Sequence, residues 1–265
     1  MRLGLLGAGS IGGTVAKAVA SGQLPGVEVV AVAGASTPPS ERVERIAALV
    51  GAEALDVGGM IQKRPDWVLE AAGNQATKTY LVPLLDAGSG VIVMSIGALL
   101  DETLHQEIRE RQRRGGRLIT PSGAIGGLDA VAALNARGGL TSARITTTKA
   151  PSGLEGAPYL LEHGIELPNN RSLTVFEGTA REAVQGFPAN VNVAAALSLA
   201  GHGADKTVVR IISDPATPRT RHAIEASGEA GVVRVEIEAN PNPENPRSSY
   251  LAALSAVATV RSLVS

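Results

Sequence analysis

Short apolar runs alternate with segments of helical periodicity through the first half of the 265-residue chain. The apolar runs are rich in Val, Ile and Leu and have the lengths of buried strands, while the segments between them are typical of helices. This alternation predicts βαβ units and therefore a parallel sheet with right-handed crossovers. The expected strands are residues 3–6, 27–33, 66–73, 91–95 and 118–120, with a helix over 41–49.

The second half of the chain has a different pattern. Residues 222–227 and 232–238 alternate in polarity and are joined by a turn, Gly228-Glu229-Ala230-Gly231. Alternation around a glycine turn predicts an antiparallel hairpin with one face in water or against a partner. Further strands are expected at 144–149, 173–178 and 207–213. Two helices are expected at 189–199 and 248–264, the second with an N-terminal cap near Pro246 and the following serines.

The two patterns predict an α/β chain with two domains, which its length supports. Residues 1–125 are expected to form a Rossmann dinucleotide-binding domain with a doubly wound parallel sheet. Residues 126–245 are expected to form a C-terminal α+β domain with a mainly antiparallel, open-faced sheet that binds substrate and pairs subunits. Residues 246–265 are expected to form a helix that returns to the nucleotide domain.

Composition excludes several classes of function. The chain has no cysteine, so disulfides, thiolate nucleophiles and thiolate-bound metals are excluded, and we predict no metal site. A net charge of −1 and an aromatic content of 2% argue against nucleic-acid binding. The first expected strand begins beside Met1 and no apolar run has the length of a membrane span, so we expect a cytoplasmic protein without membrane contact.

A glycine motif, Gly7-Ala8-Gly9-Ser10-Ile11-Gly12, stands between the first strand and a helix. This order suits a dinucleotide pyrophosphate, because Gly7 permits a tight turn, Gly9 lets the backbone approach the phosphates, and Gly12 lets the helix pack against the strand. Ser10 and Ile11 lie at the helix N-terminus, where backbone N–H groups face the anion. Ligands of parallel sheets also lie beyond the other strand ends, and there we expect contacts from Ala72, Gly73 and Ser95.

The acidic residue that usually binds the adenosine ribose is missing. A carboxylate is normally found about twenty positions after the glycines, but here the second strand is followed by Gly34-Ala35-Ser36-Thr37. Nothing in this stretch repels a 2′-phosphate, and Ser36, Thr37 or Arg42 can bind one. The sequence therefore predicts a nicotinamide cofactor, NAD or NADP, and leaves the preference open.

Several strings resemble the L-aspartate dehydrogenases, a family of two-domain NAD(P)-dependent enzymes. The most specific are residues 121–129 (PSGAIGGLD) and 187–201 (FPANVNVAAALSLAG), supported by 70–73, 95–99, 176–178, 214–215 and 245–249. The resemblance implies oxidation of L-aspartate to iminoaspartate. That product hydrolyses to oxaloacetate and ammonia or feeds NAD biosynthesis.

The resemblance also assigns roles to single residues. It places the active-site histidine at His222 and cofactor contacts at Ala124 and Asn190. A histidine suits the chemistry, because the amine must lose a proton and water must be activated to attack the imine. The chain has three other histidines, of which His202, between two glycines, is a stronger rival than His105 or His163.

The two substrate carboxylates need cations or converging N–H donors. Lys149, at the end of a β-rich run, and Arg221, beside His222, are the candidates, although each could be an ordinary charge at a strand end. Asn190 follows Phe187-Pro188 at an expected helix start, so it could cap that helix, bind the nicotinamide carboxamide or contact the substrate. These alternatives stay open.

Two other functions remain possible on this sequence. One is another two-domain reductase, such as a homoserine-type dehydrogenase or a dihydrodipicolinate-type reductase. The other is a non-catalytic NADP-binding sensor. In each case we expect a homodimer or a dimer-based tetramer, because Val233, Val235 and Ile237 would leave an apolar sheet face uncovered.

Overall fold

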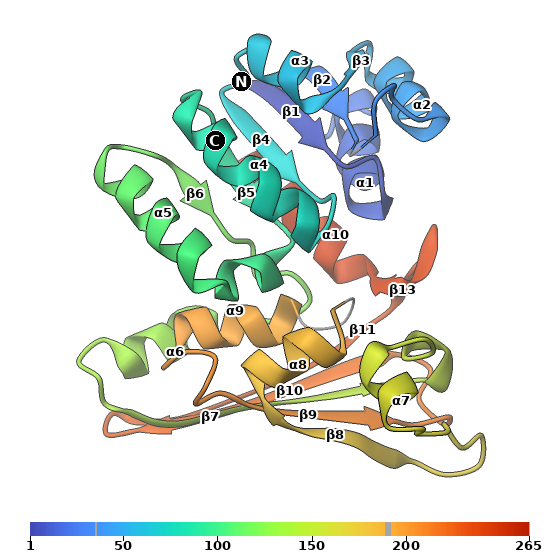
Figure 1. Cartoon of the computed structure of the whole chain (residues 1–265), viewed down its shortest axis with the longest axis vertical. Helices are drawn as coiled ribbons and strands as arrows, with labels where there is room; N and C mark the ends of the chain where they lie inside the picture. The colour runs from blue at the N-terminus through green and yellow to red at the C-terminus, as the bar shows by residue number, and fades with distance from the viewer. Residues whose placement is uncertain (35, 189–191, 265) are drawn as a thin grey trace. The chain divides into compact units, whose positions relative to one another are not determined.

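The computed structural model describes residues 1–34, 36–188 and 192–264. The chain divides into two compact units, one of Met1–Pro121 with Ala252–Ser265 and one of Ser122–Leu251. These are called the first unit and the second unit. Each is built around a sheet of its own (Figure 1).

The first unit contains a six-stranded sheet in the order β3-β2-β1-β4-β5-β6, in which every pair is parallel. The chain starts in the middle of this sheet, so the strand order reverses between β1 and β4, where sheets of this kind bind ligands. The bounds are β1 Arg2–Leu6, β2 Glu28–Ala33, β3 Glu53–Leu55, β4 Trp67–Glu70, β5 Gly90–Val93 and β6 Leu118–Ile119.

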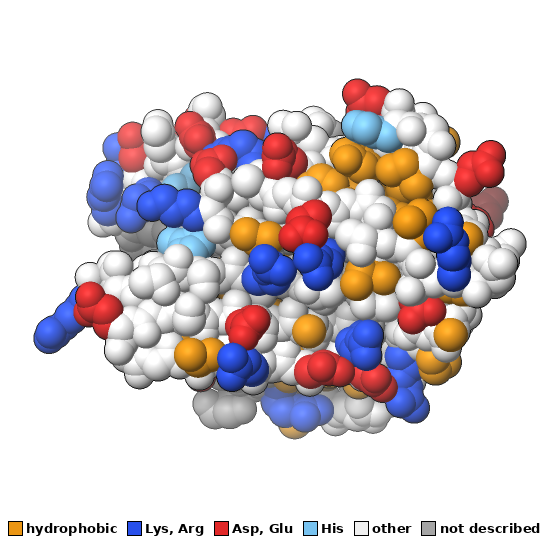
Figure 2. Space-filling view, turned by 90° about the horizontal axis from the view of Figure 1, so that it is seen from below, with side chains coloured by type: hydrophobic (Ala, Val, Ile, Leu, Met, Phe, Trp, Pro, Cys, Tyr) orange, Lys and Arg blue, Asp and Glu red, His pale blue; other side chains and the backbone are white. Residues whose placement is uncertain are grey.

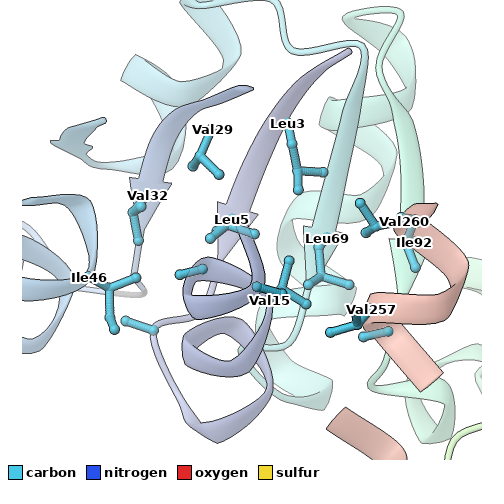
Figure 3. Packing of buried hydrophobic residues seen from close by; sticks show 14 of the residues in the cluster. Leu3, Leu5, Val15, Val29, Val32, Ile46, Leu69, Ile92, Val257 and Val260 are labelled. Carbon is cyan, nitrogen blue, oxygen red and sulfur yellow. The ribbon is translucent and has the colours of Figure 1, made fainter. Parts of the chain in front are cut away.

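Helices lie on both faces of this sheet (Figure 1). They are α1 Ser10–Ala20, α2 Glu41–Val50, α3 Val57–Gln62, α4 Asn74–Asp86, η1 Ile96–Leu100, α5 Glu102–Arg113 and α10 Tyr250–Ser262. On one face, Val15 of α1, Ile46 of α2 and Val257 of α10 pack in one apolar cluster with the sheet residues Leu5 and Leu69 (Figure 3). The last helix of the chain is therefore part of the core of the first unit.

The second unit contains a five-stranded sheet in the order β11-β10-β7-β9-β8. Three of its pairs are antiparallel and one, β7 with β9, is parallel. A two-stranded sheet of β12 and β13 completes the unit. The strands are β7 Leu140–Lys149, β8 Leu173–Thr179, β9 Val208–Ser213, β10 Thr220–Gly228, β11 Gly231–Ala239, β12 Pro241–Asn242 and β13 Asn245–Ser249. The expected fold class is confirmed, a parallel Rossmann sheet followed by a mainly antiparallel one.

Helices α6, α8 and α9 cover one face of the second sheet, and among the described residues of this unit no helix covers the other face, which is called the open face (Figure 1). They span Leu128–Asn135, Ala180–Gly186 and Asn192–Ala200, and η2 Pro151–Gly153 and the short α7 Pro158–Glu162 lie further along the chain. Figure 2 shows the open face, on which basic and acidic side chains are interspersed. Ion pairs connect them, with N···O distances of 2.9 Å between Arg234 and Glu225 and 2.8 Å between Arg210 and Glu177.

The expectation that β11 leaves an apolar face uncovered is wrong. Val233, Val235 and Ile237 point to the covered side and are half-buried. A Cβ atom on Gly127 would lie 2.7 Å from Val235, so the turn before α6 packs directly on these residues. The alternation of β11 is as expected, but the face it exposes is the charged one.

The second half of the chain contains more elements than its pattern predicts. Helix α8 has seven residues, too few for a clear period, although Thr179 and Glu182 form a complete capping box at its start. The last helix begins at Tyr250 rather than at 248, because residues 245–249 pair with β12 instead. Asn242 closes this hairpin by accepting a 2.9 Å hydrogen bond from the Glu244 N–H. Across the described residues, we find no helix long and apolar enough to cross a membrane.

Candidate active site

The glycine turn of the first unit leads from β1 into α1. Gly7 has φ +108°, and a Cβ atom there would lie 2.5 Å from the Ala71 carbonyl oxygen, so only glycine fits. A Cβ atom on Gly9, in contrast, would meet open space. Gly9 also caps α1, whose first turn from Ser10 carries no acidic residue. The turn therefore presents backbone and a helix N-terminus to an anion, which is the arrangement that a pyrophosphate needs.

The loops after β4 and β5 meet at one buried side chain, Glu70, the last residue of β4. Glu70 is 1% exposed and accepts hydrogen bonds from the N–H groups of Ala72 and Gly73, at 2.8 and 3.2 Å. Ser95, in the loop after β5, donates to the same carboxylate from its N–H at 3.1 Å and its hydroxyl at 3.0 Å. The structure thus brings Ala72, Gly73 and Ser95 together.

The loop after β2 carries Ser36 and Thr37, both exposed, and Arg42 is exposed on the first turns of α2. Since β1, β2, β4 and β5 are parallel, their carboxyl ends lie at one edge of the sheet. All predicted cofactor contacts of the first unit follow these strand ends. They are Gly7, Gly9, Ser10, Ile11, Gly12, Ser36, Ala72, Gly73 and Ser95.

In the second unit, His222 of β10 lies directly opposite Thr147 of β7 on the covered face. The Thr147 hydroxyl oxygen is 3.0 Å from His222 Nδ1, and the exposed fractions of the two residues are 3% and 4%. Lys149 lies two residues beyond Thr147 and therefore on the same face. The structure thus brings His222 and Lys149 together, with Thr147 as a third member that the sequence analysis missed.

Burial changes the acid–base properties of this cluster. It lowers the pKa of His222 to about 3, with a further lowering from the charge of Lys149. Burial also lowers the pKa of Lys149 to about 8. At neutral pH the cluster therefore holds a neutral imidazole beside an ammonium group.

A hollow of about 510 Å³ in the second unit is lined by Gly153, Phe187, Pro188, Asn245 and Ser248, among others. Gly153 also touches the lysine, because a Cβ atom there would lie 3.5 Å from Lys149 Cδ. Ser213 is paired with Lys149 in the β7–β9 register, and its buried hydroxyl has no hydrogen-bond partner among the described residues. Space for a small ligand and an unpaired hydroxyl thus both adjoin Lys149.

Other predicted site residues lie elsewhere. Arg221 points to the open face of the sheet, where its guanidinium is 4.0 Å from Glu236, so the structure does not bring it together with His222. Ala124 is buried in the turn before α6. Asn190 lies outside the described residues. The rival His202 follows α9, and its buried Nε2 atom has no partner in the described part of the chain.

Residues 129–263 match the family model described as "Aspartate dehydrogenase, C-terminal". The L-aspartate dehydrogenase of Methanosarcina mazei is 40% identical over 266 residues, which cover 100% of this chain and 97% of that protein. The one from Nitrosopumilus maritimus is 37% identical, with coverages of 98% and 95%. The chain belongs to the aspartate dehydrogenase family. This confirms the resemblance seen in the sequence strings.

Three further comparisons concern the fold. Residues 7–121 match the model "Homoserine dehydrogenase, NAD binding domain". The crystal structure of aspartate dehydrogenase from Thermotoga maritima aligns with a TM-score of 0.75 and 27% identity, covering 100% of this chain and 97% of that one. A scyllo-inositol dehydrogenase from Lactobacillus casei with bound NAD(H) aligns with a TM-score of 0.55 and 14% identity, which shows the fold alone.

The buried histidine gives a prediction about pH. The His222 imidazole should stay neutral down to about pH 5, because its pKa is lowered to about 3. The unfolded chain binds this proton near pH 6.5, so the free energy of unfolding should fall as the pH drops from about 6.5 toward 3. NMR titration of the ring and urea unfolding at several pH values measure both effects.

The variant His222→Gln should lose less stability over this pH range than the wild type. His163→Gln is a matched control, because it removes a histidine from an exposed position, and it should lose as much stability over this pH range as the wild type. A His222 ring that titrates near pH 6.5 in the folded protein would contradict the burial argument.

Proposed function

We propose that this protein is an L-aspartate dehydrogenase that uses NAD or NADP. L-Aspartate would lose a hydride from Cα and a proton from the amine to give iminoaspartate, which water would hydrolyse to oxaloacetate and ammonia; a bound nicotinamide would supply the acceptor for the hydride. The observation that carries the proposal is the buried cluster of His222, Thr147 and Lys149 in a chain whose full length matches L-aspartate dehydrogenases. We also propose that the product can feed NAD biosynthesis and that the protein works in the cytoplasm.

The first unit fits a nicotinamide dinucleotide. The open space at Gly9, the tight turn at Gly7 and the N-terminus of α1 suit the pyrophosphate. Ala72, Gly73 and Ser95 follow the neighbouring strands at the same edge of the sheet. When bound, the nicotinamide supplies the hydride acceptor, and we propose that Ala124 and Asn190 add contacts to it.

His222 is the proposed acid–base residue. Its Nδ1 atom is occupied by the Thr147 hydroxyl at 3.0 Å, which leaves Nε2 to exchange protons with the amine and with water. Burial and the charge of Lys149 hold the imidazole neutral, as a base must be. The two carboxylates of aspartate stabilise a nearby positive charge, so substrate binding should raise the pKa of His222 toward the working range.

Lys149 is the proposed cation for a substrate carboxylate. It lies on the same face as His222 and is charged below a pH of about 8. Ser213 pairs with Lys149 in the register of β7 and β9, and we propose that its hydroxyl donates to a carboxylate oxygen of the substrate. Arg221 is a weaker candidate, because it faces away from the histidine.

A homoserine-type dehydrogenase is the second candidate. The observation in its favour is the match of residues 7–121 to the homoserine dehydrogenase model, which concerns the NAD-binding part alone. The substrate is chosen by the second unit, and there the matching model is that of aspartate dehydrogenase. We therefore place aspartate first.

We expect the purified protein to oxidise L-aspartate and to reduce oxaloacetate in the presence of ammonia. His222→Ala should lower kcat by about two or more orders of magnitude, because a general acid–base residue contributes roughly that much. The binding of reduced cofactor should change less than about twofold. Absorbance of the reduced cofactor is followed with L-aspartate, D-aspartate, L-glutamate and L-homoserine in parallel.

His202→Ala is the matched control and should keep wild-type turnover. Turnover of L-homoserine but not of L-aspartate would replace the proposed substrate. Cofactor binding without turnover of any substrate would indicate a sensor, and an active His222→Ala enzyme would move the acid–base role to another residue.

The loop after β2 predicts the choice of cofactor. Ser36 is exposed and carries no charge that repels a 2′-phosphate, so wild type should accept NADP. In Ser36→Asp the new carboxylate should oppose that phosphate and shift the ratio of kcat/KM values toward NAD by tenfold or more. Glu41→Gln, at the start of α2, is the control for a nearby change of charge, and it should leave the ratio of kcat/KM values for the two cofactors close to that of wild type. A wild-type enzyme that already excludes NADP would contradict this interpretation.

We also propose a homodimer, or a tetramer of such dimers, formed through the open face of the second sheet. Basic and acidic residues alternate on this face around a hollow of about 340 Å³ that includes Thr146 and Ala223. Such a mixed pattern can match a second copy of itself across a two-fold axis.

Sedimentation should show no monomer at micromolar concentration. Ala223→Arg on the open face should dissociate the dimer, while Gln112→Arg on α5 should not. A monomeric wild type would refute the proposal.

A further inference from the structure

Glu70 is a buried acidic residue for which the proposed reaction has no use. It ends β4, an otherwise apolar strand of Trp67, Val68 and Leu69, and all four residues are buried. Burial raises the pKa of its carboxyl group, so the position is unfavourable for a charge. A carboxylate kept at such a place needs a compensating arrangement of donors.

The donors come from two loops. Oε1 accepts from the Ala72 N–H, the Gly73 N–H and the Ser95 hydroxyl, and Oε2 accepts from the Ser95 N–H. Gly73 N–H also lies 3.1 Å from Ser95 Oγ, so the two loops are joined a second time. Thr77 of α4 adds a side-chain hydrogen bond to the carboxylate. In these four hydrogen bonds from backbone and Ser95 donors the carboxylate is the acceptor, which an ionised side chain can satisfy at both oxygens.

The first of these loops touches the glycine turn. The Cβ position of Gly7 lies 2.5 Å from the Ala71 carbonyl oxygen and 2.8 Å from the Ala72 nitrogen. The Ala72 N–H is itself a donor to Glu70. Glu70 therefore fixes a backbone segment that is in van der Waals contact with the turn for the pyrophosphate.

We propose that Glu70 is a positioning residue that holds the loops after β4 and β5 in the shape required by the dinucleotide. It acts through the backbone of Ala72, Gly73 and Ser95 and does not itself touch the cofactor. The proposal rests on the proposed use of a nicotinamide dinucleotide. The new proposal goes beyond cofactor use, because it assigns the shape of the binding site to one buried carboxylate, that of Glu70.

The variant Glu70→Gln tests this at nearly constant volume. Its amide places an NH2 group against either the Ser95 N–H or the three donors at the other oxygen, so a donor faces a donor. We expect the Kd for NADH, measured by fluorescence titration, to rise at least tenfold. The KM for the cofactor should rise more than kcat falls. In the cofactor-free protein, amide hydrogens of Ala72 and Gly73 should exchange faster.

Ser89→Ala is the matched control. Ser89 is buried just before β5, and its hydroxyl donates a 2.8 Å hydrogen bond to the Pro65 carbonyl, at the amino end of the same two strands. This variant also loses one buried hydrogen bond, but far along the strands from the glycine turn. We expect its melting temperature to fall while its Kd for NADH stays within about twofold of wild type.

A second variant, Ser95→Ala, removes only the hydroxyl donor and should raise the Kd for NADH about threefold or more. If Glu70→Gln does not fold, Ser95→Ala still tests the proposal: faster exchange of the Ala72 and Gly73 amide hydrogens in its cofactor-free form is expected from lost positioning and not from a lost direct contact of Ser95 with the cofactor. An unchanged Kd in folded Glu70→Gln, or in Ser95→Ala, would overturn the proposal, as would an equal loss of affinity in Ser89→Ala. Wild-type protein that does not bind NADH would instead overturn the proposed cofactor.

Discussion

A strand turns every second side chain to the same face of its sheet, and the chemistry of the second unit depends on this constraint. Thr147 and Lys149 share a face of β7, and pairing with β10 places His222 directly opposite Thr147. A shift of one residue in that register would bring Arg221 to the covered face and send the histidine to the open one. The register of two antiparallel strands therefore decides whether the imidazole lies on the same face as Lys149.

The covered face then sets the acid–base properties of these residues. Removing water disfavours the charged form of each group, and the ammonium of Lys149 further disfavours a second positive charge on His222. The pair carries one charge at neutral pH and has its pKa values separated, as is typical of functional sites. A dianionic ligand would reverse part of this effect. The neutral histidine thus results from burial and from the charge of Lys149.

The sequence predicted the fold well wherever the periodicity was long. Five strands of the first sheet, β1, β2, β4, β5 and β6, and the hairpin of β10 and β11 were found because their apolar patterns are strong. Short elements such as β3 and α8 were missed, since three or seven residues give little periodicity. Alternation in β11 separated an apolar face from a charged one, but what covers the apolar face, here α6 and the Gly127 turn, is not contained in any local pattern.

The same limit applies to the candidate site. His222, Lys149 and the glycine turn were named from local strings, whereas Thr147 and Glu70 became visible only through partners 75 and 25 residues away in the chain. Each had a local signal. Thr147 lies two positions before Lys149 in the same strand, and Glu70 is an acidic residue at the end of an apolar strand. Such signals are ambiguous alone, because a threonine or glutamate at a strand end is usually solvated. Their burial with converging hydrogen bonds is what distinguishes them, and a buried carboxylate without a cation persists only where surrounding donors offset its desolvation.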